Sequence, residues 1–352
     1  MNKSPNVVGI AQLNEFPDRI DVRSPAEYAE DHITGARNHP VLDDDERAQI
    51  GTLHKQESAF VAKRAGAALV ARNVAAMLES AFADKPRDWR PLVYCWRGGK
   101  RSGALTHILN EIGWKAAQLE GGYKTYRRCV IDALLILPQT LSYRVICGVT
   151  GSGKSRLLQG LRAVGAQVLD LEELARHRGS LLGDLPGDPQ PSQRRFENLL
   201  WDALRRFTPE RPVYVESESK KVGEIRVPQN LIDAMWASNC VRLEMPLASR
   251  VALLREEYSH FIADPEALKG KLSHLCALRG ADTLRRWHEQ AVAGEWDALV
   301  QDLLLNHYDP TYLRSMQCNY PQYGRADLVE VSDIGTAAWA ETAGRIVARH
   351  GI

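Results

Sequence analysis

The chain has 352 residues, of which 44% are hydrophobic and 25% are charged, and its formal net charge at pH 7 is +1. This length suggests two domains, and the composition excludes a disordered or fibrous protein. The small net charge excludes attraction of the whole molecule to a polyanion, so a nucleic-acid site must be a local basic patch. No run approaches the ~18 apolar residues of a membrane span. Since the N-terminus also lacks the apolar stretch of a secretory signal, we expect a cytoplasmic protein.

The first part of the chain, residues 12–136, alternates short apolar runs with helical patterns and therefore predicts an α/β domain. The run PLVYC predicts a strand that ends at Cys95. Residues 102–112 then repeat apolar side chains at helical spacing. The predicted order around Cys95 is a strand, a glycine-rich loop and the N-terminus of a helix.

The loop that begins at Cys95 reads Cys-Trp-Arg-Gly-Gly-Lys-Arg-Ser. A cysteine attacks an electrophile as its thiolate, which backbone N–H groups, a helix N-terminus and nearby cations stabilise. The glycine pair lets the backbone turn its N–H groups inward, and the helix directs its dipole at the sulfur. We therefore predict an anion-binding catalytic site formed by Cys95, Arg97 and Arg101, with Lys100 beside it. The alternative is a strand-end cysteine next to a solvated basic turn.

Two stretches resemble the rhodanese family. One is the Cys95 loop, and the other is Asp21-Val-Arg-Ser-Pro-Ala-Glu-Tyr, which is followed by His32-Ile-Thr-Gly-Ala-Arg-Asn. The resemblance implies a rhodanese-like N-terminal domain, in which Asp31 stands where glycine is usual. We expect Asp21 and Arg23 to form a buried pair that holds the end of a strand.

The spacing from Cys95 to Arg101 is C-x5-R, which is typical of cysteine phosphatases and the phosphatase relatives of rhodanese. A loop of this length should enclose a larger, tetrahedral anion. The loop alone therefore leaves a phosphatase open beside a sulfurtransferase.

A second motif, Gly148-Val-Thr-Gly-Ser-Gly-Lys-Ser, matches the P-loop pattern G-x-x-x-x-G-K-[ST] in full and has a predicted strand before it and a helix after it. Its backbone N–H groups should cradle a di- or triphosphate, while Lys154 contacts the terminal phosphates and Ser155 ligates Mg²⁺. The loop specifies phosphates only, so ATP, GTP and another pyrophosphate all stay open. The predicted phosphate-binding residues are Gly148, Gly151, Gly153, Lys154 and Ser155.

An acidic side chain at a strand end should accompany the P-loop. Glu216 follows the apolar run PVYV and is our candidate, although a surface glutamate in ESESKK needs no special role. Asp170 also ends a predicted strand, but its spacing to Glu173 fits a helix-capping box better.

From residue 140 to 352, predicted strands alternate with helices, which indicates a parallel sheet covered on both faces. Within this P-loop domain, residues 246–325 are rich in Leu, Arg and Glu at helical spacing. We expect this stretch to be a helical insertion or subdomain.

A rhodanese-like domain followed directly by a P-loop domain, in this order and length, is similar to the tRNA 2-selenouridine synthases. The closer match is carried by Cys95-Trp-Arg-Gly-Gly-x-Arg-Ser, Leu119-Glu-Gly-Gly-Tyr-Lys-x-Tyr-Arg, the P-loop, His177-Arg-Gly-Ser-x-x-Gly and His307-Tyr-Asp-Pro-x-Tyr. Membership implies that wobble 2-thiouridine in tRNA is S-geranylated from geranyl diphosphate, and that selenium from selenophosphate then replaces the geranylthio group. On this hypothesis Cys95 carries selenium as a selenylsulfide, and the P-loop holds the prenyl diphosphate without ATP hydrolysis.

The same resemblance implies tRNA as the partner and a selenophosphate-producing enzyme as a supplier. Basic residues that could contact tRNA phosphates, with Tyr123 and Tyr126 for stacking, are Lys124, Arg127, Arg128, Arg194 and Arg195. Each of these cations also fits a solvated surface. The alternative function is a nucleotide-dependent kinase or ATPase with an attached sulfurtransferase or cysteine-phosphatase-like domain.

Overall fold

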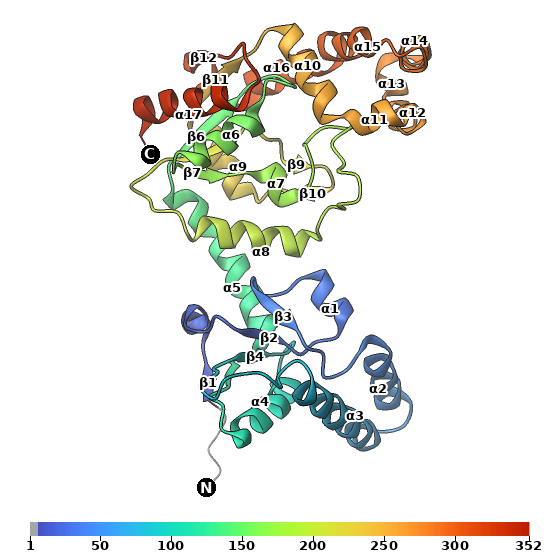
Figure 1. Ribbon diagram of the computed structural model, residues 1–352, viewed down its shortest axis with the longest axis vertical. Helices are drawn as coiled ribbons and strands as arrows, with labels where there is room; N and C mark the ends of the chain where they lie inside the picture. Colours follow the sequence, from blue (N-terminus) through green and yellow to red (C-terminus); the bar gives the residue numbers. More distant parts are fainter. Residues whose placement is uncertain (1–5, 352) are drawn as a thin grey trace. The chain divides into compact units, whose positions relative to one another are not determined.

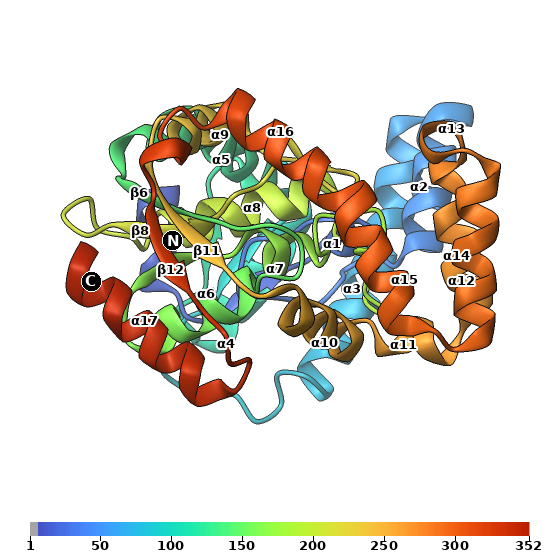
Figure 2. The same cartoon turned by 90° about the horizontal axis from the view of Figure 1, so that it is seen from above.

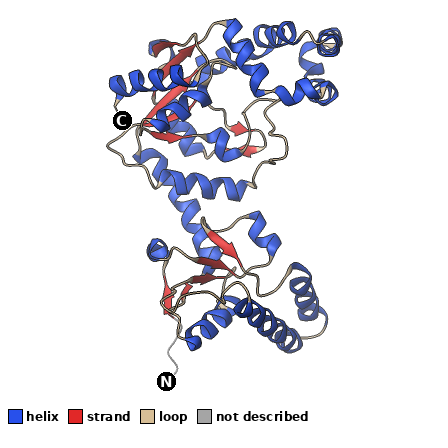
Figure 3. Ribbon diagram, in the orientation of Figure 1, coloured by secondary structure: helices blue, strands red, loops and turns tan. Residues whose placement is uncertain are grey.

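The structure, a computed structural model, describes residues 6–351. The chain divides into two compact units. The first comprises the residues up to Ala133 together with Ser192–Leu199, and the second comprises Leu134–Pro191 and the residues from Leu200 onward. Each unit contains a sheet flanked by helices (Figures 1 and 3), which confirms the predicted α/β class. The first unit takes in Ser192–Leu199, a segment that the sequence placed in the P-loop domain.

The sheet of the first unit has five parallel strands in the order β1-β5-β4-β2-β3. They are β1 (Asn6–Val8), β2 (Arg19–Asp21), β3 (Ala36–Asn38), β4 (Leu92–Tyr94) and β5 (Ala117–Leu119). The helices are α1 (Pro25–Glu30), α2 (Asp44–Gln56), α3 (Ala59–Glu79), α4 (Lys100–Ile112) and α5 (Gly122–Ile136). Because β4 is the central strand and ends at Tyr94, Cys95 follows its carboxyl end.

The core of the first unit lies between the sheet and the helices α3 and α4. Val74 of α3 and Leu105 and Leu109 of α4 pack against Ile20 of β2 and Val93 of β4, and all five are at most 2% exposed. This packing fixes α4 against the central strand. The N-terminus of α4 is thereby held next to Cys95.

The second unit also has a five-stranded parallel sheet, in the order β12-β11-β6-β8-β7. These strands are β6 (Tyr143–Cys147), β7 (Gln167–Leu169), β8 (Val213–Glu216), β11 (Asn239–Glu244) and β12 (Asp327–Glu330). A short antiparallel pair is formed by β9 (Lys221–Val222) and β10 (Ile225–Arg226). The P-loop follows β6, so in both units the candidate site lies at the carboxyl end of the central strand. Ligands of parallel α/β sheets usually bind at that edge.

Two helices that are far apart in sequence cover one face of the second sheet. Leu157 and Leu161 of α6 (Lys154–Ala163) share a core with Trp339 and Ile346 of α17 (Thr336–His350) and with Val241 of β11. The remaining helices of the second unit include α7 (Leu171–Ala175) and α9 (Gln229–Trp236). The helix α8 (Gln193–Leu204) begins in the first unit and ends in the second.

The stretch 246–325 is helical, as the sequence predicts. Figure 2 shows α11 to α15 grouped at one side of the second sheet, with α10 and α16 leading to them. The helices are α10 (Leu247–Glu257), α11 (Ser259–Ala263), α12 (Pro265–Leu272), α13 (Cys276–Arg279), α14 (Ala281–Ala293), α15 (Trp296–Leu303) and α16 (Asp309–Asn319). They enclose a separate core around Trp287 and Leu299. Within residues 6–351, no helix combines the length and apolar character that crossing a bilayer requires.

Candidate active sites

Cys95 is the first residue of the loop that joins β4 to α4, and only 2% of its surface is exposed. Its thiol donates to the backbone oxygen of Arg97 at 3.6 Å, and the Ser102 hydroxyl donates to its sulfur at 3.4 Å. A hydroxyl that points at sulfur stabilises the thiolate more than the thiol, because a hydrogen bond to an ion is the stronger one. The local geometry is therefore suited to a nucleophilic cysteine.

Both glycines of the loop are required by their backbone conformation, and Gly99 is also required by close packing. Gly98 and Gly99 have φ angles of 70° and 71°, in the left-handed region. A Cβ atom on Gly99 would also lie 2.4 Å from Nε2 of Gln118. That same Gln118 amide donates to the Gly99 carbonyl and to the Ser102 hydroxyl, at 2.9 Å each, and so fixes both the loop and the hydroxyl that faces Cys95. The sequence pattern did not indicate Ser102 or Gln118, although a glutamine inside the buried strand β5 is an available signal.

The Gly-Gly-Tyr-Lys stretch at the start of α5 forms backbone hydrogen bonds with the cysteine loop. The backbone N–H of Tyr123 donates to the carbonyl of Cys95 at 2.8 Å, and that of Lys124 donates to the carbonyl of Trp96 at 3.0 Å. A Cβ on Gly122 would lie 2.4 Å from the Cys95 oxygen. Glycine is therefore required here for close approach of the two backbones.

The three cations of the loop differ in their surroundings. Arg97 and Lys100 are exposed, whereas Arg101 is partly buried and forms an ion pair with Glu27, with Nη1 and Oε2 2.9 Å apart. Burial alone would raise the pKa of Glu27, but its contacts with Arg101 and Arg47 lower that pKa below its ordinary value. The charge of Arg101 is therefore largely balanced by Glu27.

Asp31, which stands where rhodanese sequences usually have glycine, is 1% exposed and accepts several hydrogen bonds. The Tyr123 hydroxyl donates to it at 2.5 Å and the Asn198 amide at 2.9 Å, so it links α1, α5 and the segment Ser192–Leu199 within the first unit. The predicted buried pair is confirmed, since Arg23 and Asp21 are joined at 2.6 Å with at most 1% of either side chain exposed.

Three of the basic residues proposed for tRNA contact are engaged within the first unit. Arg127 pairs with Glu197, and Arg194 pairs with Glu30 at 2.7 Å. Arg195 donates to a backbone carbonyl at 3.0 Å. Neutralised or tethered cations of this kind contribute less to a phosphate-binding patch than exposed ones.

The other residues of that prediction fall into two groups. Lys124 and Arg128 are exposed on α5. Tyr123 and Tyr126 are 1% and 0% exposed, so the expectation that they stack on bases is wrong. The two rings lie three positions apart on a helix, and this spacing directs both of them into the core.

The P-loop, residues 148–155, connects β6 to α6 and brings its predicted residues together. Gly151 and Gly153 have φ angles of 77° and 82°, and a Cβ on Gly153 would lie 2.2 Å from the Trp339 ring. The Lys154 ammonium donates to the Gly148 carbonyl at 2.8 Å. The loop therefore has the glycine-dependent conformation that turns backbone N–H groups toward a phosphate.

The helical insertion holds the P-loop from the side. Arg250 of α10, 5% exposed, donates from Nε and Nη2 to the carbonyl of Thr150 at 2.9 and 2.8 Å, and pairs with Asp309 at 2.6 Å. The N–H of Gly148 donates to the Tyr312 hydroxyl at 2.6 Å. Asp309 and Tyr312 belong to the His-Tyr-Asp-Pro-x-Tyr stretch, which thus has a structural role at the P-loop.

Glu216 ends β8 and is buried, and one of its carboxylate oxygens is held by the start of α7. Its Oε1 accepts from the N–H groups of Leu171 and Glu172 at 2.6 and 2.9 Å, at the start of α7. Burial, followed by the nearby carboxylates, raises the pKa of Glu216 well above its ordinary value. Glu216 is absent from the residues that line the surrounding cavity. Asp170 caps α7 as predicted, since it accepts from the N–H of Glu173 at 2.8 Å.

Glu172 and Glu218 are among the acidic residues that line the cavity around the P-loop. The Ser155 hydroxyl donates to Oε2 of Glu172 at 3.0 Å. Burial raises the pKa of Glu172, and it raises the pKa of Glu218 to about 8. Glu172 was missed in the sequence because it lies in the first turn of a helix and not at a strand end.

The cavity around the P-loop has a volume of about 840 Å³. Its cationic side chains include Lys154, Arg156 and Arg178. Among residues 6–351 no cluster of three metal-ligating side chains was found. Mg²⁺, however, is usually held by one or two protein oxygens together with substrate phosphates, and the Ser155 and Glu172 oxygens fit that donor set.

Comparison with known families defines the class of protein. Residues 10–129 match the rhodanese-like domain family, and residues 141–275 match the family described as the tRNA 2-selenouridine synthase AAA domain. The chain thus joins a rhodanese-like domain to a P-loop domain. Among solved structures, a rhodanese-related protein from Thermoplasma volcanium is similar at 20% identity and a TM-score of 0.23, covering 35% of this chain and 91% of that chain.

Curated relatives extend the match over nearly the whole chain. A tRNA 2-selenouridine synthase from Aeromonas salmonicida (strain A449) is 35% identical, covering 86% of this chain and 87% of the relative. A protein of the same name from Hydrogenovibrio crunogenus is 32% identical, with coverage of 88% and 93%. The chain belongs to the tRNA 2-selenouridine synthase family.

Proposed function

We propose that this chain converts 2-thiouridine at the wobble position of tRNA to 2-selenouridine in the cytoplasm, using geranyl diphosphate and then selenophosphate. The observation that carries this proposal is the presence of two anion sites in one chain of this family. One is a buried thiol within a basic loop, and the other is a P-loop. Each site supplies one of the two steps.

In the first step the sulfur of 2-thiouridine attacks C1 of geranyl diphosphate. The C–S bond forms, the C–O bond breaks, diphosphate leaves with the bonding electron pair, and the N3 proton of the base is lost to water. The P-loop N–H groups and the Lys154 ammonium stabilise the charge that develops on this leaving group. Ser155 and Glu172 would hold a Mg²⁺ ion, which would neutralise further charge on the diphosphate. No ATP is consumed.

In the second step selenium passes through the Cys95 site. A selenylsulfide at Cys95 would form if the thiolate attacked selenium, but phosphorus would then have to leave as phosphite with the Se–P electron pair, and we favour a route that releases phosphate. The step balances when the Cys95 thiolate attacks phosphorus. An S–P bond forms, the Se–P bond breaks, and hydrogen selenide ion leaves with the electron pair. Hydrolysis of the S–P bond by water then restores the thiol and releases phosphate.

The released hydrogen selenide ion attacks C2 of the S-geranylated base. The C–Se bond forms, and the C–S bond breaks with its electron pair on the geranylthiolate, which takes up the selenium's proton. Two features support this route. The C-x5-R spacing from Cys95 to Arg101 suits a tetrahedral anion, and the Ser102 hydroxyl stabilises the thiolate.

For tRNA contact we propose the exposed cations Lys124 and Arg128 first, with Arg127, Arg194 and Arg195 as weaker contributors. Exposed cations release counterions when they meet backbone phosphates, which makes binding salt-dependent. Replacing both exposed residues with glutamine should weaken tRNA binding and reduce its salt slope by about 2.

The two steps can be separated by two variants. Lys154→Ala should abolish geranylation of thiolated tRNA but still convert a supplied geranylated tRNA, whereas Cys95→Ser should do the reverse. Each product is read by mass spectrometry of nucleosides. Normal geranylation by Lys154→Ala, or steady ATP turnover by the wild type without tRNA, would favour the kinase or ATPase alternative.

A further inference from the structure

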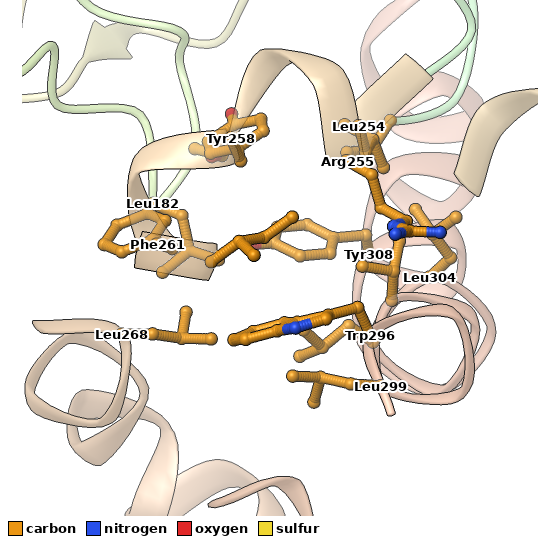
Figure 4. A pocket seen from close by; sticks show the side chains of 15 residues that line it. Leu182, Leu254, Arg255, Tyr258, Phe261, Leu268, Trp296, Leu299, Leu304 and Tyr308 are labelled. Carbon is orange, nitrogen blue, oxygen red and sulfur yellow. The ribbon is translucent and has the colours of Figure 1, made fainter. Parts of the chain in front are cut away.

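A second, narrower cavity lies beside the P-loop cavity in the second unit. Figure 4 shows its walls, formed mainly by apolar and aromatic side chains of the helical insertion, such as Leu254, Phe261, Leu268, Trp296 and Leu299. Apolar walls of this kind suit a hydrocarbon, because a polar group buried there would lose its hydrogen bonds with water.

The two cavities adjoin. Five residues line both of them, namely Thr150, Ser180, Leu254, Tyr258 and Tyr308. Thr150 belongs to the P-loop itself, so the apolar cavity adjoins the loop that would bind phosphates. Burial raises the pKa of both tyrosines, which keeps their phenol groups uncharged at this junction.

We propose that the apolar cavity binds the hydrocarbon chain of a prenyl diphosphate whose diphosphate is held by the P-loop, and that the wall formed by Leu268, Trp296 and Leu299 sets the chain length. This inference rests on the proposed function, because it assigns a place to the chain of the geranyl donor. A nucleotide fits the pair of cavities poorly, since its ribose and base carry polar groups that the apolar walls would leave unpaired.

The far wall is identified by its position relative to the junction. Figure 4 shows Leu268, Trp296 and Leu299 across the cavity from Tyr258 and Leu254, which also line the phosphate cavity. Leu268 and Leu299 are 5% and 1% exposed, and Trp296 is half-buried. A chain that enters past Tyr258 therefore ends against the indole of Trp296, and a longer chain would collide with it.

The first test enlarges the cavity. In Trp296→Ala, the ratio of farnesyl to geranyl transfer onto thiolated tRNA should rise at least ~10-fold, because one isoprene unit exceeds the single methylene that is worth 10- to 200-fold in an apolar pocket. The affinity for inorganic pyrophosphate, measured by calorimetry, should not change. Trp236→Ala is the matched control, since Trp236 lies on α9 and lines neither cavity. An unchanged ratio in Trp296→Ala would overturn the proposal.

The second test fills the cavity. Leu268→Trp should weaken geranyl diphosphate binding at least ~10-fold while dimethylallyl diphosphate and pyrophosphate bind normally. The control is Leu278→Trp, at a position on α13 that is 72% exposed. If the wild-type protein binds geranyl diphosphate no more tightly than pyrophosphate, the apolar cavity does not bind the hydrocarbon, although the P-loop can still bind the diphosphate. If it binds neither, the proposed function fails with it.

Discussion

Replacing Asp31 with glycine, the residue usual at this position in rhodanese sequences, should destabilise the first unit. The φ angle of Asp31 is −169°, which is extended backbone that aspartate adopts without strain. The contribution of Asp31 to stability therefore comes from its side chain, which accepts hydrogen bonds from the Tyr123 hydroxyl and the Asn198 amide. The Asn198 amide also reaches the carbonyl of His32, so the principal loss falls on the Tyr123 hydroxyl.

Tyr123 is 1% exposed, so its hydroxyl cannot turn to water in the variant. Leaving one buried donor without an acceptor costs ~1–3 kcal/mol, and the added backbone freedom of glycine costs ~0.5–1 kcal/mol more. The sum, about 2–4 kcal/mol, corresponds to a Tm decrease of roughly 5–15 °C for a unit of this size.

Differential scanning calorimetry of the full chain would measure this shift, with hydrogen exchange used to assign the transition to the first unit. Tyr123→Phe is the informative partner, because it removes the donor that Asp31→Gly would leave unsatisfied. The double variant should show a coupling of at least ~1 kcal/mol. A loss below ~1 kcal/mol in Asp31→Gly, or additive losses in the double variant, would refute the reasoning.

Three further outcomes are expected. Because the pKa of Glu218 in the folded protein is about 8, above the ordinary ~4.3, the folded state binds the extra proton, and the free energy of unfolding should fall as pH rises from ~4.3 to about 8. Pyrophosphate affinity should fall only as pH rises through about 8, where the carboxyl of the folded protein ionises. Glu218→Gln should flatten both profiles. Gly98 and Gly99 have the same left-handed φ, but only a Cβ on Gly99 meets Gln118; Gly99→Ala should therefore lower selenation at least ~10-fold more than Gly98→Ala, and equal losses would argue against that contact. Arg250→Met removes one partner of a buried ion pair that also holds a P-loop carbonyl; it should cost ~3–5 kcal/mol in the second unit, and unchanged pyrophosphate binding would show that Arg250 does not shape the loop.

The two motifs could be predicted because each is local in sequence. The Cys95 loop and the P-loop each lie between a strand and a helix that are adjacent in sequence. The local sequence pattern therefore determines their conformation. The three-residue strands β1, β3 and β5 are too short to show a period of two. Their place in the sheet depends on pairing with distant strands.

The supporting contacts could not be predicted, because they join distant parts of the chain. Asp31 and Asn198 are separated by 167 positions, and Arg250 meets Thr150 across 100. For Glu216 the sequence indicated the strand end but not the two N–H groups of α7 that donate to its Oε1. Tyr123 and Tyr126 were misassigned although their helical spacing already indicated a core stripe.

The central claim is that selenation proceeds through a prenylated intermediate made by this chain. The most direct measurement incubates wild-type protein with thiolated tRNA and selenophosphate, with and without geranyl diphosphate, in the absence of ATP, and follows the nucleosides by mass spectrometry over time. The account predicts that S-geranyl-2-thiouridine rises first, that 2-selenouridine follows it, and that neither forms without geranyl diphosphate. Formation of 2-selenouridine at the same rate without geranyl diphosphate, or only when ATP is added, would contradict the account.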